Sequence, residues 1–174
     1  MSILFNERTQ TFHLYNEEIS YLMAVLPNGH LGQLYFGGRI HHKEDFSYLV
    51  ETSCRPMTAS VFDGDRSFSL EHIRQEYGVY GTTDFRHPAV EILQKNGSRI
   101  SDFVYQGHEI MDGKPELPGL PATYTEDAKE AQTLTVSLKD PVTGIVLKLF
   151  YTIFAGGGIL ARSAGLINEG SESV

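Results

Sequence analysis

The chain has 174 residues, of which 41% are hydrophobic and 21% charged, a composition typical of a globular protein with an ordinary core. Its formal net charge is −8, and its 14 basic residues are scattered among 22 acidic ones without forming a run, which argues against nucleic-acid binding. No apolar stretch reaches the roughly 18 residues that cross a membrane, the amino terminus does not resemble a signal peptide, and the single cysteine, Cys54, has no disulfide partner, so we expect a cytoplasmic protein.

The amino-terminal third has the period of β-strands. Residues 11–15 alternate, residues 19–26 are rich in β-forming side chains, and residues 31–36 resume the pattern before two glycines. The turn sequence Pro27-Asn28-Gly29 separates the last two stretches and predicts a hairpin.

The middle of the chain is less regular. An Asn-Gly turn at residues 95–98 predicts a hairpin between residues 90–93 and 99–105, followed by a short strand over 108–111. Residues 67–77 are the best helix candidate, with Ser67 as its cap. The remaining segments, 37–66 and 112–130, read as long loops, which often carry function or contact partners.

The carboxy-terminal third gives the clearest signal. Apolar residues of segment 133–139 alternate with polar ones, and turns then link this segment to strands over 145–154 and 159–167. Three hairpin-linked strands form a meander. We therefore predict an all-β protein, a large two-layer antiparallel β-sandwich with long loops and at most one or two short helices.

We expect residues 1–174 to form a single β-sandwich domain of a longer protein. The turn sequence Asn168-Glu169-Gly170-Ser171 follows the last predicted strand, and the chain stops just beyond it. An open sheet edge at that point would expose unpaired N–H and C=O groups.

Possible metal and cofactor motifs are weak, and we predict neither a metal site nor a cofactor. Adjacent His41 and His42 point to opposite faces of an extended chain, so one ion rarely binds both. The segment Asp63-Gly64-Asp65 lacks further ligands of a calcium loop. The glycines at 156–158 do not open a helix, which disfavours a phosphate cradle and favours a hairpin tip.

A catalytic centre is equally hard to find. Cys54 has no evident base beside it. The spacing of the 22 carboxylates along the sequence does not single out any pair of them. From the residues alone, we predict no catalytic site.

Two segments carry a family resemblance. One runs from Asp65-Arg66-Ser67-Phe68-Ser69-Leu70 to Tyr80-Gly81-Thr82-Thr83-Asp84-Phe85-Arg86-His87-Pro88-Ala89, and the other is Leu117-Pro118-Gly119-Leu120-Pro121-Ala122-Thr123-Tyr124. Both resemble the amino-terminal domain of bacterial α-galactosidases of glycoside hydrolase family 36. The resemblance extends from Ile3 to Asn168.

This resemblance implies a β-sandwich that precedes a catalytic (β/α)8 barrel in an enzyme that releases terminal α-linked galactose, as from melibiose or raffinose, with retention. Its two catalytic aspartates lie on the barrel, so no catalytic residue falls in this chain and we expect it to be inactive alone. The implied partners are the enzyme's own barrel, neighbouring subunits of a homo-oligomer, which is a tetramer in many members, and α-galactosides.

The resemblance also suggests a place for individual residues. We expect Arg66 to lie at the rim of the substrate pocket, where a guanidinium can hold hydroxyls; the alternative is an ion pair with Asp63, Asp65 or Glu71. We expect Tyr77, Tyr80 and Phe85 to anchor a loop on the sandwich, and Pro118 and Pro121 to form a rigid turn.

Two other functions stay open at this point. The first is a free-standing carbohydrate-binding sandwich, although the chain has no Trp for a stacking platform. The second is an interaction domain without a ligand, which the two motif-rich loops disfavour.

Overall fold

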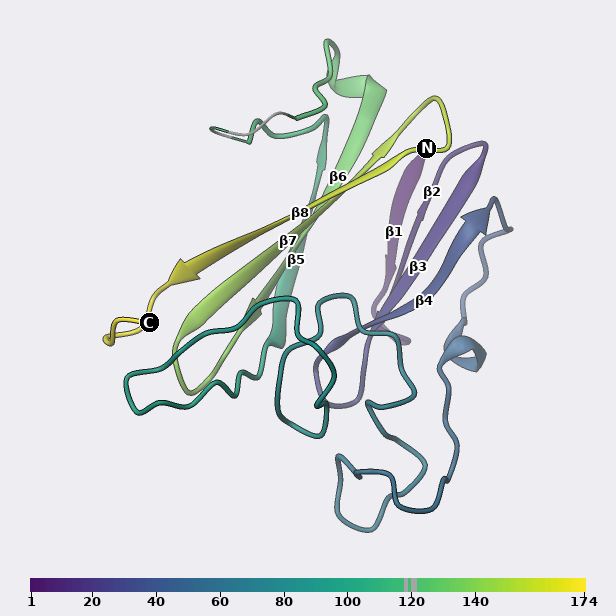
Figure 1. The fold of residues 1–174 in the computed structure, drawn as a ribbon. Helices are drawn as coiled ribbons and strands as arrows, with labels where there is room; N and C mark the ends of the chain where they lie inside the picture. Colours follow the sequence, from purple (N-terminus) through teal and green to yellow (C-terminus); the bar gives the residue numbers. More distant parts are fainter. Residues whose placement is uncertain (118, 120–121) are drawn as a thin grey trace.

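A computed structural model of the chain describes residues 1–117, 119 and 122–174. Two antiparallel four-stranded sheets face each other and enclose the main core, with strand orders β1-β2-β3-β4 and β5-β6-β7-β8 (Figure 1). The predicted all-β, two-layer sandwich is therefore confirmed. No helix within the described ranges is long and apolar enough to cross a membrane.

The strands follow one another in simple up-and-down order within each sheet. The first sheet contains β1 (Ser2–Asn6), β2 (Thr11–Tyr15), β3 (Ile19–Val25) and β4 (Leu31–Gly38). The second contains β5 (Val104–Asp112), β6 (Ala131–Lys139), β7 (Ile145–Phe154) and β8 (Leu160–Asn168). Two 3₁₀ turns, η1 (Ser47–Leu49) and η2 (Ala128–Glu130), lie in the loops.

Alternation along the strands builds the core. Every second residue of a strand points to the same face, so the apolar set of each strand meets the apolar set of the opposite sheet. The fully or almost fully buried members include Phe12, Leu14, Tyr21 and Met23 from the first sheet, and Leu134, Val136, Leu147, Leu149 and Tyr151 from the second.

The predicted meander is confirmed as β6, β7 and β8. β2 and β7 have the predicted bounds, whereas β1 was not predicted. The hairpin predicted around the Asn-Gly turn at residues 95–98 is wrong, because the strands predicted on either side of that turn do not form as expected. Gly97 does turn the chain with a φ of 85°, but residues 90–93 form no strand and the sheet resumes only at Val104.

The predicted helix over residues 67–77 is also wrong. This segment is irregular, because Gln75 forms a β-bridge with Gly32 and Glu76 N–H donates to the Leu31 carbonyl at 2.9 Å. Phe68, Leu70 and Ile73 pack with Leu26 in a small separate core. Pairing with β4 thus replaces the local hydrogen bonds that a helix would need.

The long connection between β4 and β5 covers one side and one end of the sandwich. It first runs along the outer face of the first sheet, where Phe46 packs on Leu22, Ala24 and Leu34. It then crosses beneath both sheets before entering β5 (Figure 1). Most of the residues that carry the family resemblance lie in this connection.

Candidate functional site

Arg66 lies in the connection between β4 and β5 and is exposed. No ion pair joins its guanidinium to Asp63, Asp65 or Glu71 within the described residues, so the alternative interpretation of Arg66 finds no support. The side chain is therefore available to a partner from outside these residues.

Neighbouring residues hold the backbone of Arg66 in place. Asp65 accepts hydrogen bonds from the Ser67 hydroxyl at 2.6 Å and the Ser67 N–H at 2.8 Å, which lower the pKa of its carboxyl. Phe62 stacks on the buried ring of Phe68, with ring centroids 5.7 Å apart. The backbone on both sides of Arg66 is thus held in place, while Arg66 itself is exposed.

Residues 80–89, the latter part of the first segment that carries the family resemblance, are organised by Asp84. Its buried carboxylate accepts hydrogen bonds from Nε and one Nη of Arg86, each at 2.9 Å. The same guanidinium also donates to the backbone carbonyls of Leu70 and Ile73. Burial raises the pKa of Asp84, but the hydrogen bonds from Arg86 outweigh it and the net pKa lies below the usual value. Arg86 therefore joins residues 70–73 to residues 80–89 of this segment.

The aromatic residues of this stretch have different roles. Tyr77 packs against the main core and anchors the loop as expected. Tyr80 and Phe85 do not: they are 41% and 62% exposed and pack edge-to-face with their centroids 5.6 Å apart. They form an exposed aromatic pair beside the motif.

A buried polar cluster, which sequence reasoning missed, joins this loop to both sheets. The Glu76 carboxylate accepts hydrogen bonds from the Tyr21 hydroxyl of β3 at 2.5 Å and the Tyr151 hydroxyl of β7 at 2.9 Å. Arg162 of β8 donates to the same carboxylate at 2.7 Å. Burial, reinforced by Glu76, raises the pKa of both tyrosines, so both remain donors. The cluster is fully occupied by its own members and offers no open catalytic group.

His42 has an unexpected partner on β2. Its Nδ1 lies 3.0 Å from Nδ1 of the buried His13, whose Nε2 lies 3.0 Å from the Ser20 hydroxyl. Burial, followed by His42 and Arg39, lowers the pKa of His13 from 6.5 to about 4. The contact between the two histidines packs segment 39–50 on the sheet, and it does not form a metal site.

His13 makes the stability of the fold pH-dependent. The unfolded chain takes up this proton below pH 6.5, whereas the folded chain takes it up only near pH 4. We expect the contribution of His13 to the free energy of unfolding to be fully present above pH 6.5. It should decrease as the pH falls toward 4, by up to about 1.4 kcal/mol per pH unit. Urea unfolding between pH 4 and pH 6.5 measures how the free energy of unfolding depends on pH. We expect this pH dependence to be weaker in the His13→Gln variant. An identical slope in that variant would contradict the assignment.

The remaining candidate motifs form no metal-binding or catalytic group among the described residues. No group of three or more His, Cys, Asp or Glu with metal-binding geometry occurs among the described residues. Asp63 and Gly64 form a tight turn between Phe62 and Asp65, and Cys54 is an exposed free thiol. Residues 156–158 lie in the β7–β8 hairpin loop.

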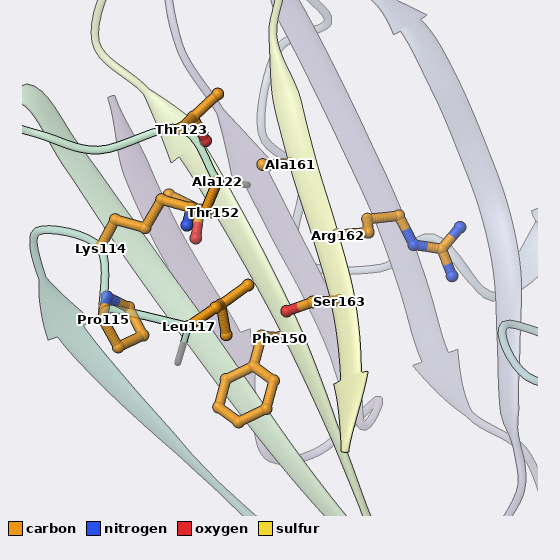
Figure 2. Close-up of a pocket in the computed structure, with 10 residues that line it drawn as sticks. All are labelled: Lys114, Pro115, Leu117, Ala122, Thr123, Phe150, Thr152, Ala161, Arg162 and Ser163. Atoms are coloured by element: carbon orange, nitrogen blue, oxygen red, sulfur yellow. The ribbon is translucent and has the colours of Figure 1, made fainter. Parts of the chain in front are cut away.

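A shallow cleft of about 160 Å³ lies on the outer face of the second sheet. Lys114, Leu117 and Thr123 line it from the β5–β6 loop, and Phe150, Thr152 and Ser163 line it from the strands (Figure 2). Arg162 also borders the cleft, but its side chain points away from the other residues (Figure 2). The predicted turn at Pro118 and Pro121 lies outside the described residues. Its described lining residues present apolar and hydroxyl groups with one lysine, and none of them carries a carboxylate.

Sequence comparison identifies relatives along the whole chain. The chain is 38% identical over 172 residues to alpha-galactosidase AgaA of Geobacillus stearothermophilus, covering 99% of this chain and 24% of the relative. It is 36% identical over 179 residues to alpha-galactosidase Mel36A of Lactobacillus acidophilus, with the same coverage, 99% and 24%. The chain thus spans about a quarter of the length of these curated relatives.

Solved structures share the fold. The alpha-galactosidase of Lactobacillus brevis superposes with a TM-score of 0.93 at 38% identity, over 98% of this chain and 23% of that one. The GH36 alpha-galactosidase AgaB of Geobacillus stearothermophilus gives 0.89 at 37% identity, over 99% and 23%. The model of the glycosyl hydrolase family 36 N-terminal domain matches residues 29–174, and the chain therefore belongs to this family.

Proposed function

We propose that the chain is the non-catalytic amino-terminal part of a retaining α-galactosidase whose (β/α)8 barrel lies outside these 174 residues. Its role is to support the barrel, to take part in homo-oligomer assembly and to contribute to the rim of the active site. Membership of the family, together with the quarter-length coverage of its relatives, carries this proposal. Solved complexes of AgaA variants with raffinose and stachyose suggest α-galactosides as substrates of the intact enzyme.

The carboxylates of the chain support a non-catalytic role. A retaining glycosidase needs two carboxylates on either side of the sugar, roughly 5 Å apart. The buried ones here are already engaged: Glu76 by Tyr21, Tyr151 and Arg162, and Asp84 by Arg86. Asp140 accepts the N–H groups of its own turn, from residues 142 and 143.

Arg66 is the residue proposed to reach the pocket rim. It is the exposed cation of a loop fixed by Asp65 and Phe68, and its guanidinium makes no ion pair within the part of the chain that is described. The lone exposed thiol of Cys54 is compatible with the reducing cytoplasm that we propose as its location.

The chain alone is expected to be inactive. We expect no hydrolysis of p-nitrophenyl α-galactoside by the purified 174-residue chain, because the proposal places both carboxylates of the retaining pair on the barrel, outside this chain. The intact enzyme, assayed in parallel, is the positive control. Turnover that co-purifies with the folded chain would overturn the proposal, and galactose binding without turnover would favour a carbohydrate-binding module instead.

Arg66→Ala tests the rim role in the intact enzyme. We expect KM for raffinose to rise roughly tenfold with a smaller change in kcat, because a charge-assisted hydrogen bond to a hydroxyl is lost. Arg99→Ala is the matched control, since Arg99 is exposed and pairs with Glu91 at 3.2 Å. Unchanged KM and kcat in the Arg66 variant would leave only the supporting role.

A further inference from the structure

Three large apolar side chains form an exposed patch at the end of the segment that carries the family resemblance. Tyr80, Phe85 and Ile100 are 41%, 62% and 51% exposed. The two rings pack on each other with their centroids 5.6 Å apart. Ile100 lies against the turn between them, since a Cβ added at Gly81 would come within 2.5 Å of its Cγ2. We call these three side chains the apolar patch.

The backbone beneath the apolar patch is fixed by hydrogen bonds. Gly81 and Asp84 exchange two backbone hydrogen bonds across the turn, and Arg86 holds the carboxylate of Asp84. The Ser101 N–H donates to the Tyr80 carbonyl at 3.2 Å, which ties the neighbouring segment to the turn. A surface whose backbone is already fixed loses little conformational entropy when another surface covers it.

The turn that carries the two rings adopts a conformation that its sequence disfavours. Thr82 and Thr83 have φ of 49° and 75°. Their buried hydroxyl oxygens have no hydrogen-bond partner among the described residues. Backbone strain of this kind clusters at active sites, ligand clamps and switch regions. The strain makes the turn a candidate for binding.

A hollow of about 490 Å³ adjoins the apolar patch, because two of its lining residues, Asp84 and Arg86, flank one of the rings in sequence. Arg86 pairs with Asp84 at 2.9 Å, and the other lining carboxylate, Glu76, pairs with Arg162 at 2.7 Å. Arg74 also lines the hollow, and no ion pair joins it to a described residue. The hollow therefore has one uncompensated positive charge, although the net charge of the chain is −8.

Exposed aromatic rings beside arginines are typical of the centre of protein–protein interfaces. A sugar fits less well, because the two rings are inclined at 72° and offer no common stacking platform. We propose that the apolar patch is the centre of a docking face for the rest of the same polypeptide, and that an acidic side chain from that part pairs with Arg74. This assignment rests on the proposed function, since the relatives, of which the chain covers about a quarter, have the additional length that supplies such a partner.

Hydroxyl-radical labelling of the intact enzyme, followed by mass spectrometry, tests the docking face. The urea-unfolded enzyme gives the intrinsic labelling rate of each ring. In the folded enzyme we expect labelling of Tyr80 and Phe85 to be slowed more than about tenfold, because a docked surface excludes water from both rings. Their exposures of 41% and 62% alone would keep the slowing below about threefold, and that result would overturn the proposal.

The same measurement distinguishes other occupants of the docking face. Protection of the rings that disappears on dilution of the enzyme would indicate a second copy, and protection that requires raffinose would indicate a sugar site. Either result would refute docking of the same polypeptide. Labelling requires no turnover, so an active enzyme with exposed rings would refute the docking face and leave the proposed function intact.

Charge reversal at Arg74 tests the acidic partner. In the intact enzyme we expect Arg74→Glu to raise the labelling rate of Phe85 about tenfold, because like charges then face each other across the interface. Lys129→Glu is the matched control, since Lys129 is exposed in η2 and forms no ion pair with a described residue. Equal labelling of Phe85 in the two variants would exclude an acidic partner of Arg74.

Discussion

Replacing Glu76 by alanine is expected to destabilise the fold by about 3–5 kcal/mol, the usual cost of removing one partner from a buried ion pair. The Glu76 side chain is 0% exposed and is the common acceptor for Tyr21, Tyr151 and Arg162. Without it, the hydroxyls of Tyr21 and Tyr151 lose the acceptor of their hydrogen bonds, and the guanidinium of Arg162 keeps only its carbonyl contact and partial access to water. Urea unfolding at constant pH measures the loss.

Two variants separate this cluster from a general effect of substitution in the loop. Glu71→Ala changes an exposed carboxylate five residues away and is expected to alter stability by less than about 0.5 kcal/mol. Tyr151→Phe removes a single hydroxyl and should cost about 1–3 kcal/mol. If Glu76→Ala and Glu71→Ala cost the same, the cluster does not hold the loop to the sheets.

Strict alternation made part of this fold predictable. β2 and β7 were placed at their observed bounds because one face of each meets the opposite sheet, so a shift of one residue would expose its apolar set. β1 was missed because Ile3, Leu4 and Phe5 are consecutive apolar residues without alternation. Alternation of apolar and polar residues predicts a strand that is buried on one face, and it does not identify strands whose sequence lacks this alternation.

The polar clusters were beyond sequence reasoning for a different reason. Glu76 lies 55 residues from Tyr21 and 75 from Tyr151, and no local pattern marks any of them as a pair. The false helix at 67–77 shows the same limit, since its apolar spacing serves packing against Leu26 from an irregular backbone. Arg66 was identified only by resemblance, and its role depends on groups outside the chain.

The turn at residues 81–84 is expected to be strained, and relieving that strain should stabilise the fold. Thr82 and Thr83 have φ of 49° and 75°, a combination that suits Asn-Gly and costs a β-branched residue about 1 kcal/mol or more at each position. We expect Thr82→Asn combined with Thr83→Gly to raise stability by about 2 kcal/mol, and the melting temperature by roughly 4–8 °C. Calorimetry of the chain measures both.

The turn persists despite its sequence because its ends are fixed. Gly81 and Asp84 exchange two backbone hydrogen bonds of 2.8 and 2.9 Å, and Asp84 is held by Arg86. Gly97→Ala calibrates the cost of positive φ alone, since its φ is 85° and an added Cβ would contact nothing. If Gly97→Ala destabilises while the double variant gains nothing, the threonines must be compensated by contacts of their own. Their buried hydroxyls have no hydrogen-bond partner among the described residues, so such compensation would have to come from packing.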